Sequence, residues 1–125
     1  MMRISQNLSS FTQHEIAHFF KSSRRVYKGP SFDILCLPAT KPFGRIIVIT
    51  PRKIGNAPAR NKIRRQIKAI FYQEQLYLNN VDCMVIIKKL PVALTLPDVT
   101  LLIKNALENF KNSSTSHANT HSSSN

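Results

Sequence analysis

The sequence predicts an α/β fold, a two-layer α+β sandwich in which helices pack on a small mixed sheet. Two observations carry this prediction. Short apolar segments of strand length alternate along the chain with longer segments that have helical periodicity. The chain has 125 residues, which is enough for a single modest core and too few for two. The expected order of elements is α-β-β-α-β-α.

The first helix is predicted from a start signal close to the N-terminus. Thr12 and Glu15 have the spacing of a capping box, in which each side chain accepts a hydrogen bond from the backbone N–H of the other residue. Phe11 precedes the cap and can pack onto Ile16 in the first turn. The helix should end near Ser22, and its apolar face carries Ile16, Phe19 and Phe20.

Three segments have the length and composition of strands. Residues 31–37 alternate between two faces, and residues 45–50 are apolar on both faces, so we expect these two to form an antiparallel hairpin. Residues 82–89 form the third strand. Because a helix-length connection separates it from residues 45–50, those two strands should be parallel. The basic cluster at Arg24–Lys28 is a possible additional short strand.

A basic helix lies between the last two strands. Residues 52–68 carry seven of the eighteen Lys and Arg residues and no acidic residue. Asn56 is placed to cap a helix that has Pro58 in its first turn and continues to about Leu78. At helical spacing one side is polar and the other apolar, so the helix can bury one face and offer the other to a polyanion. The apolar side carries Ile63, Ile67, Ile70 and Phe71.

The chain should close with an amphipathic helix followed by a polar tail. Thr95 and Asp98 repeat the spacing of a capping box, with Pro97 in the first turn. The apolar stripe then runs to Phe110. We expect residues 1–111 to form one domain and residues 112–125, rich in Ser and Asn, to be disordered.

The net charge of +12 favours nucleic acid or an anionic surface as the partner. The longest apolar runs, residues 46–49 and 84–87, are far too short to span a membrane. We see no secretory signal at the N-terminus. Cys36 and Cys83 have no CxxC spacing and are expected to be reduced residues of the core, so the cytoplasm is the expected location.

Residues 14–18, HEIAH, fit the H-E-x-x-H pattern of zinc hydrolases, in which two histidines bind zinc and the glutamate activates water. Two facts weaken this interpretation. The later histidines, His117 and His121, lie in the polar C-terminal segment, and Glu15 already has a capping role. A metalloprotease is therefore a remote alternative, and we assign no metal ligand to the protein.

Residues 52–71, RKIGNAPARNKIRRQIKAIF, resemble the signature of the protein subunit of bacterial ribonuclease P. In that family a strand ends in Ser-Lys-Lys-x-Gly-x-Ala, and Arg-Asn-Arg/Lys-x-Lys/Arg-Arg follows. The resemblance extends over roughly residues 3 to 110. The residues that match directly are Gly55, Asn56, Ala57, Arg60, Asn61, Lys62, Arg64 and Arg65.

The resemblance implies a ribonucleoprotein enzyme in which the RNA subunit is the catalyst. Mg²⁺ ions bound mainly through that RNA would activate water to remove the 5′ leader of precursor tRNA, and one protein would bind each RNA. The protein would hold the catalytic RNA with its signature helix and the leader in a cleft between the first helix and the sheet. A left-handed βαβ crossover is also implied, against the general rule.

Transferred to this sequence, the RNA-contacting residues would be Arg52, Lys53, Arg60, Asn61, Lys62, Arg64, Arg65 and Lys68. The leader cleft would contain Ile16, Phe20, Asp33 and Leu35, with Arg45 nearby. No residue of the protein would be catalytic. Several positions depart from the family pattern, namely Ile16, Asp33, Leu35, Ile47, Pro51, Arg52 and Ala69.

The departures at Ile16 and Leu35 remove aromatic rings, so stacking of leader bases should be weaker or differently arranged. Phe20 remains as one stacking platform, whereas Phe19 is assigned to the core. The alternative to the ribonuclease P function is a non-catalytic RNA-binding protein of ribosomal or double-stranded-RNA type.

Overall fold

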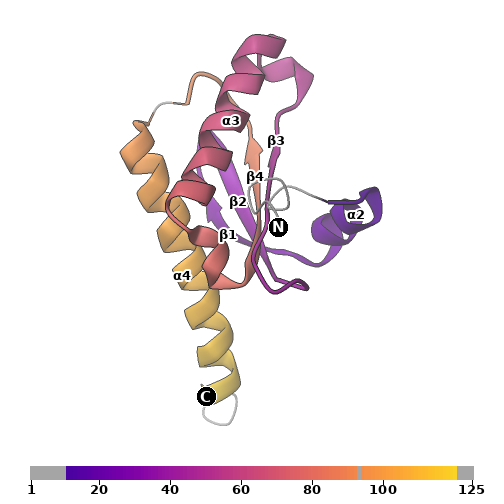
Figure 1. The fold of residues 1–125 in the computed structure, drawn as a ribbon, viewed down its shortest axis with the longest axis vertical. Helices are drawn as coiled ribbons and strands as arrows, with labels where there is room; N and C mark the ends of the chain where they lie inside the picture. The colour runs from indigo at the N-terminus through magenta and orange to yellow at the C-terminus, as the bar shows by residue number, and fades with distance from the viewer. Residues whose placement is uncertain (1–10, 93, 121–125) are drawn as a thin grey trace, which may run out of the picture.

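The computed structural model describes residues 11–92 and 94–120 and contains a four-stranded mixed sheet with helices on both of its faces (Figure 1). The elements in chain order are α2 (Gln13–Ser22), β1 (Arg24–Lys28), β2 (Phe32–Pro38), β3 (Ile46–Ile49), the short 3₁₀ helix η1 (Arg52–Ile54), α3 (Ala57–Gln73), a second 3₁₀ helix η2 (Leu76–Asn79), β4 (Val81–Ile87) and α4 (Leu96–Thr120). The order is therefore α-β-β-β-α-β-α. The additional strand is the basic segment β1, which pairs with the edge of β2.

The strands lie in the order β1-β2-β4-β3. The predicted parallel pairing of β3 and β4 is confirmed. The predicted hairpin between β2 and β3 is wrong, because β4 lies between them and pairs antiparallel with β2 from Phe32↔Ile87 to Pro38↔Val81. Strand β4 is the longer partner, so pairing with it satisfies more backbone groups of β2 than the four-residue β3 could.

The main core lies between one face of the sheet and the helices α3 and α4. The apolar side of α3 is buried as predicted, and α4 contributes a matching stripe. The residues of that stripe are Val99, Ile103, Ala106, Leu107 and Phe110. Helix α2 covers part of the opposite face, where Phe19, Leu35 and Met84 form a second cluster. The prediction of helices on a small mixed sheet is confirmed, with α2 on the face away from α3 and α4.

The predicted helix starts are confirmed in detail. The backbone N–H of Glu15 donates to Thr12 Oγ1 over 3.1 Å, and the N–H of Thr12 donates to Glu15 Oε1 over 2.9 Å. At the start of α4, the N–H of Asp98 donates to Thr95 Oγ1 over 3.2 Å, which is one of the two bonds of the predicted capping box. Local sequence was sufficient here because both partners of each bond lie within one helical turn.

Two helix ends differ from the prediction. Helix α3 ends at Gln73 rather than near Leu78, because Gln75 adopts a left-handed conformation with φ of 55° and η2 begins at Leu76. Helix α4 continues to Thr120, past the segment at 112 where we expected disorder to begin. Backbone hydrogen bonds extend it beyond Phe110, which is buried against the sheet. The rest of the expected tail, residues 121–125, lies outside the described residues.

Cys36 and Cys83 are free, buried, and directly opposite each other in the β2–β4 register, as expected for core residues. Among the described residues, no helix combines the length and the apolar character that crossing a membrane requires.

Candidate RNA-binding surface

The basic segment is held at its start by the predicted cap. The Oδ1 atom of Asn56 accepts a hydrogen bond from the N–H of Ala59 over 2.9 Å, and Pro58 lies in the first turn of α3. The buried side of the helix packs on the sheet through Ile67 and Phe71, which are fully enclosed. Anchoring one side of α3 in the core fixes which side faces outward.

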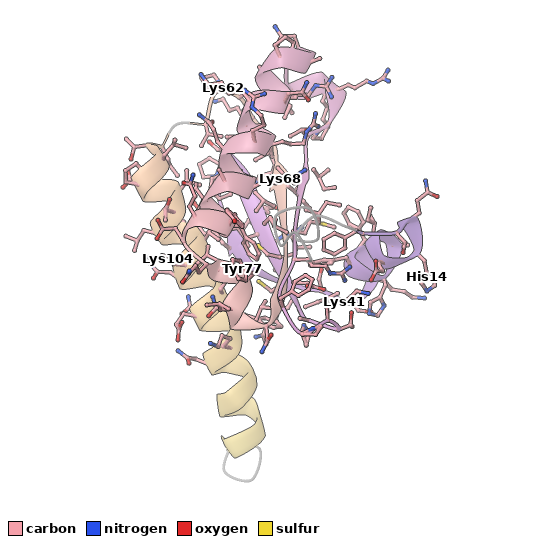
Figure 2. The ribbon with its side chains drawn as sticks, viewed as in Figure 1. His14, Lys41, Lys62, Lys68, Tyr77 and Lys104 are labelled. Carbon is pink, nitrogen blue, oxygen red and sulfur yellow. The ribbon has the colours of Figure 1, made fainter. Side chains whose placement is uncertain are left out.

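The outward side of α3 and η1 presents cations without acidic neighbours. Arg52, Lys53, Lys62 and Arg65 are exposed, and Lys68 is half-buried one turn further along. None of the ion pairs within the described residues involves these five side chains. Figure 2 shows Lys62 and Lys68 projecting from α3. Unpaired cations along one helix face form the electrostatic footprint of a nucleic-acid-binding protein.

Two of the predicted RNA-contacting arginines have partners inside the protein. Arg60 donates from Nε to the carbonyl of Gly55 over 3.1 Å and from Nη1 to the carbonyl of Thr50 over 3.5 Å. Arg64 donates to the hydroxyl of Thr50 and to the side chain of Asn61. These bonds tie α3 to the end of β3. Arg60 and Arg64 therefore help to position the basic helix and have fewer donors left for a ligand.

The predicted cleft residues do not form one exposed surface. On α2, Phe20 is 56% exposed and Ile16 is half-buried, whereas Leu35 lies beneath the helix in the core. Asp33 is also buried, and its carboxylate pairs with Arg25 at 3.3 Å and with Lys88 at 2.9 Å. The structure thus leaves Phe20 and Ile16 accessible for a ligand on this face and uses Leu35 for packing. The assignment of Phe19 to the core is confirmed by its exposure of 1%.

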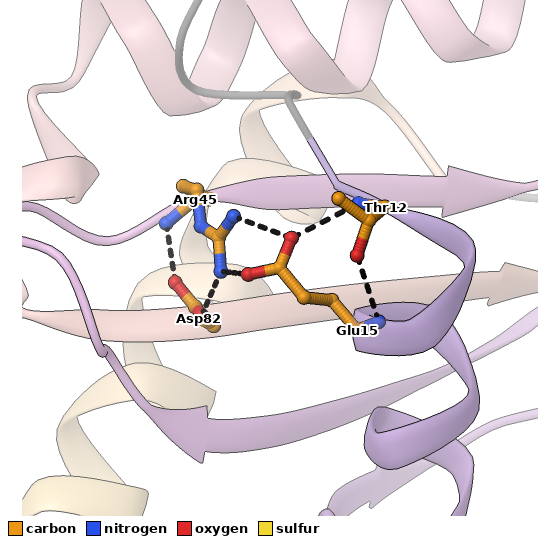
Figure 3. Close-up of polar contacts among 4 residues, drawn as sticks. All are labelled: Thr12, Glu15, Arg45 and Asp82. Atoms are coloured by element: carbon orange, nitrogen blue, oxygen red, sulfur yellow. Dashed lines mark hydrogen bonds and ion pairs between the residues drawn. The ribbon is translucent and has the colours of Figure 1, made fainter.

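Arg45, which we expected near the cleft, is buried at the junction of α2 with the sheet, with an exposure of 3%. Its guanidinium donates to both oxygens of Glu15, over 3.2 and 3.0 Å, and to Asp82 Oδ2 over 3.1 Å (Figure 3). The backbone N–H of Arg45 donates to Asp82 Oδ1, and the guanidinium lies 4.2 Å from the centre of the Phe11 ring. Arg45 therefore links α2, β3 and β4.

Glu15, Arg45 and Asp82 shift one another's pKa values. Hydrogen bonds from Arg45 and from the backbone of Thr12 lower the pKa of Glu15 from 4.5 to about 2. Burial raises the pKa of Asp82 and outweighs its hydrogen bonds from Arg45. Burial alone would lower the pKa of Arg45, but its bonds to Glu15 and Asp82 raise it above the ordinary value. The arginine thus stays charged and holds Glu15 ionised.

The HEIAH segment has a structural role in this arrangement. A pocket of about 490 Å³ beside α2 is lined by His14 and His18, with Glu15 and Arg45 in its wall. Glu15 is committed to the capping box and to Arg45, which leaves it poorly placed to activate water. Within the part of the chain that the structure describes, no three His, Cys, Asp or Glu side chains gather in a way that could hold a metal ion.

Sequence reasoning missed the partners of Arg45 and Asp33. Asp82 is a charged residue at the start of an otherwise apolar strand, and a buried carboxylate normally has a partner. That signal could have indicated an ion pair for Asp82, although it could not have named Arg45. The pairing of Asp33 with Arg25 and Lys88 depends on the β1-β2-β4 strand order, which was not predicted.

Comparison with known structures gives the same fold. The ribonuclease P protein of Thermotoga maritima is 20% identical, and the match covers 81% of this chain and 96% of that chain with a TM-score of 0.66. The ribonuclease P protein of Staphylococcus aureus is 19% identical, with coverage of 83% and 95% and a TM-score of 0.68.

No sequence among curated proteins is similar enough to count as a match. The family comparison, however, covers most of the domain, because residues 6–111 match the ribonuclease P family. With the basic face of α3 in the position of the signature, the chain belongs to the ribonuclease P protein family.

Proposed function

We propose that this protein binds the catalytic RNA of a bacterial ribonuclease P and the 5′ leader of precursor tRNA, with one protein per RNA, in the cytoplasm. The observation that carries the proposal is the outward face of α3 and η1, where exposed cations have no acidic partner among the described residues. The family supplies the identity of the RNA partner.

The protein's contribution is electrostatic. Catalytic RNA and precursor tRNA are both polyanions, and a protein with a net charge of +12 between them reduces their repulsion. If about five phosphates are engaged, the logarithm of the affinity should fall with the logarithm of the salt concentration with a slope of roughly 3.5 to 4.5. Exposed cations such as Lys62 and Arg65 would make the phosphate contacts.

The proposal assigns hydrolysis to the RNA subunit. Mg²⁺ held mainly by that RNA would supply the activation of the attacking water. Three of the protein's carboxylates are already bound to cations, since Glu15 and Asp82 bind Arg45 and Asp33 binds Arg25 and Lys88. The side chains of this chain would neutralise phosphate charge and orient the two RNAs.

The leader would pass over the exposed part of α2. Phe20 offers an accessible ring on which a single-stranded base can stack, a contact worth about 1–3 kcal/mol. Arg25 and Lys88 pair with Asp33 but remain partly exposed. They would therefore also be able to bind phosphates of the leader.

Reconstitution tests the proposal. A ribonuclease P RNA transcript should cleave precursor tRNA at low Mg²⁺ concentration faster with this protein than without it. The matched control is the Lys62→Ala, Arg65→Ala variant, which should stimulate less at equal concentration. Failure of the unaltered protein to stimulate cleavage, combined with binding to unrelated RNA, would favour the general RNA-binding alternative and overturn the proposal.

A further inference from the structure

An apolar groove lies beside the basic face of α3 and has no role in the function described so far. It has a volume of about 480 Å³ and runs between the first turns of α3, the segment that joins β4 to α4, and the start of α4. Its apolar lining comes mainly from Ile54, Leu90, Pro91, Val92, Leu94 and Leu96. The polar side chains that line it are Asn56, Lys62 and Gln66, and none of its lining residues is acidic.

Gly55 lines this groove at a position where neither the backbone conformation nor the packing requires a glycine. Its φ of 167° is extended backbone that any residue can adopt. A Cβ added there would meet Leu90 Cδ1 at 3.4 Å and Ala59 Cβ at 3.8 Å, which are ordinary contacts. By contrast, a Cβ on Gly44 would lie 2.3 Å from the carbonyl oxygen of Val81, so that glycine is required by packing. The missing side chain of Gly55 leaves bare backbone in the groove, as where a ligand approaches closely.

The rim of the groove combines apolar and cationic groups. Leu94 and Leu96 are 39% and 43% exposed and lie together on this rim, where they form a small apolar patch. Lys62 lies on the same rim and belongs to the basic face. A ligand with an apolar body joined to a negatively charged group would match both the apolar walls and Lys62.

We propose that this groove binds one unpaired nucleobase of the RNA that the basic face of α3 contacts. A base has flat apolar faces that suit the Leu, Val and Pro walls, and its polar edge can exchange hydrogen bonds with the amide of Gln66. The attached phosphate would meet Lys62. Asn56 keeps its NH₂ group available, because its Oδ1 already caps α3.

A nucleobase suits the groove better than a peptide segment would. Lys62 and the neighbouring cations of the basic face attract a phosphate chain. An uncharged apolar peptide would offer these cations no negatively charged partner. The volume also exceeds that of a single base and leaves room for its ribose at the open side. The inference rests on the proposed function, since it presumes that α3 binds RNA.

Two substitutions test the groove. Gly55→Ala places a methyl group in the groove at tolerable distances, and Leu94→Ser removes an exposed part of its wall. Each should weaken binding to a ribonuclease P RNA transcript by at least about fivefold, the low end of what a bound base contributes. The salt dependence of binding should keep its slope, because the phosphate contacts are untouched. Leu101→Ser is the control, since Leu101 is also a solvent-exposed leucine but does not line the groove.

A second measurement detects the base directly. Adenosine 5′-monophosphate and ribose 5-phosphate carry the same phosphate, and only the first has a base. In NMR titrations of the full chain, the nucleotide should shift the amide signals of Gly55, Gln66 and Val92, whereas ribose 5-phosphate should shift only signals of the basic face. Equal effects of the two compounds would overturn the proposal.

The outcomes separate this inference from the proposed function. If the unaltered protein stimulates cleavage and the groove variants bind the RNA as tightly as it does, the groove proposal fails and the function stands. If the unaltered protein neither binds the RNA nor stimulates cleavage, both fail. A groove variant that binds weakly with a reduced salt slope would show that phosphate contacts were lost instead, and would also overturn the groove assignment.

Discussion

Arg45 and Glu15 are joined by two parallel hydrogen bonds, from the two terminal nitrogens of the guanidinium to the two oxygens of the carboxylate. The pair connects the first turn of α2 to the start of β3, and α2 otherwise contacts the sheet through a small cluster around Phe19. The placement of α2, and with it of Phe20, therefore depends on a buried arginine.

Replacing Arg45 by Met should destabilise the protein strongly. The substitution keeps much of the apolar volume but leaves the buried Asp82 without its cation, a loss worth about 3–5 kcal/mol for a buried pair. Urea unfolding followed by circular dichroism measures the change. Lys21→Met, an exposed position on α2, serves as the control. Equal unfolding midpoints for the two variants would contradict the structural role of Arg45.

Stability should fall as the solution is made acidic, and Glu15 should account for part of the fall. Its pKa is lowered from 4.5 to about 2 in the folded protein, so its stabilising contribution is complete above pH 4.5 and is lost as the pH falls toward 2. Asp82 acts in the opposite direction because its pKa is raised. Glu15→Gln should flatten the acid limb of a plot of unfolding free energy against pH. Glu108→Gln, at an exposed site, should leave the limb unchanged.

The two neighbouring phenylalanines of α2 should respond to truncation in opposite ways. Phe19→Ala removes a fully buried ring and should cost about 3–5 kcal/mol of stability. Phe20→Ala removes an exposed ring and should change stability by less than about 0.5 kcal/mol while weakening binding of precursor tRNA with a leader. Mature tRNA, which has no leader, is the control ligand. Equal weakening for both tRNAs would remove Phe20 from the leader site.

The basic residues of α3 should divide into two groups. Lys62→Ala with Arg65→Ala should weaken RNA binding and leave the thermal midpoint unchanged, because both side chains are exposed and outside the ion pairs of the described residues. Arg60→Ala with Arg64→Ala should weaken binding without unfolding the protein and should also lower the midpoint by a few degrees, because their bonds to Thr50 are lost.

Thr50→Val distinguishes these roles. It removes the hydroxyl that Arg64 binds and leaves both arginines in place. A reduced midpoint with unaltered RNA affinity would assign the Thr50 contact to stability alone. Unchanged midpoints in both the Thr50 and the Arg60–Arg64 variants would contradict the tie between α3 and β3.

Features whose partners are close in sequence were predictable. The capping box of Thr12 and Glu15 and the Asn56 cap each join residues three positions apart, and the structure contains all of these bonds. The apolar side of α3 followed from helical periodicity in the same way.

Features that depend on distant partners were not predictable. Arg45 binds Glu15 and Asp82 from 30 and 37 positions away, so its neighbours in the sequence do not show that it is buried in an ion-paired cluster. The wrong prediction of a β2–β3 hairpin has the same cause. The sequence of β2 does not indicate that β2 pairs with the distant strand β4 rather than with the next strand, β3. The groove beside Gly55 also needs three segments brought together before it exists.

The position of β4 in the sheet has a consequence for how the protein is made. Within the part of the chain that the structure describes, strand β3 pairs only with β4, which is synthesised after the whole of α3. A nascent chain that ends before Val81 therefore has no strand partner for β3 and no completed sheet on which the apolar side of α3 can settle. The cationic face acquires a fixed direction only after the last strand is inserted. Pairing between strands that are far apart in the sequence slows folding. We therefore expect only chains whose synthesis has passed β4 to bind RNA productively.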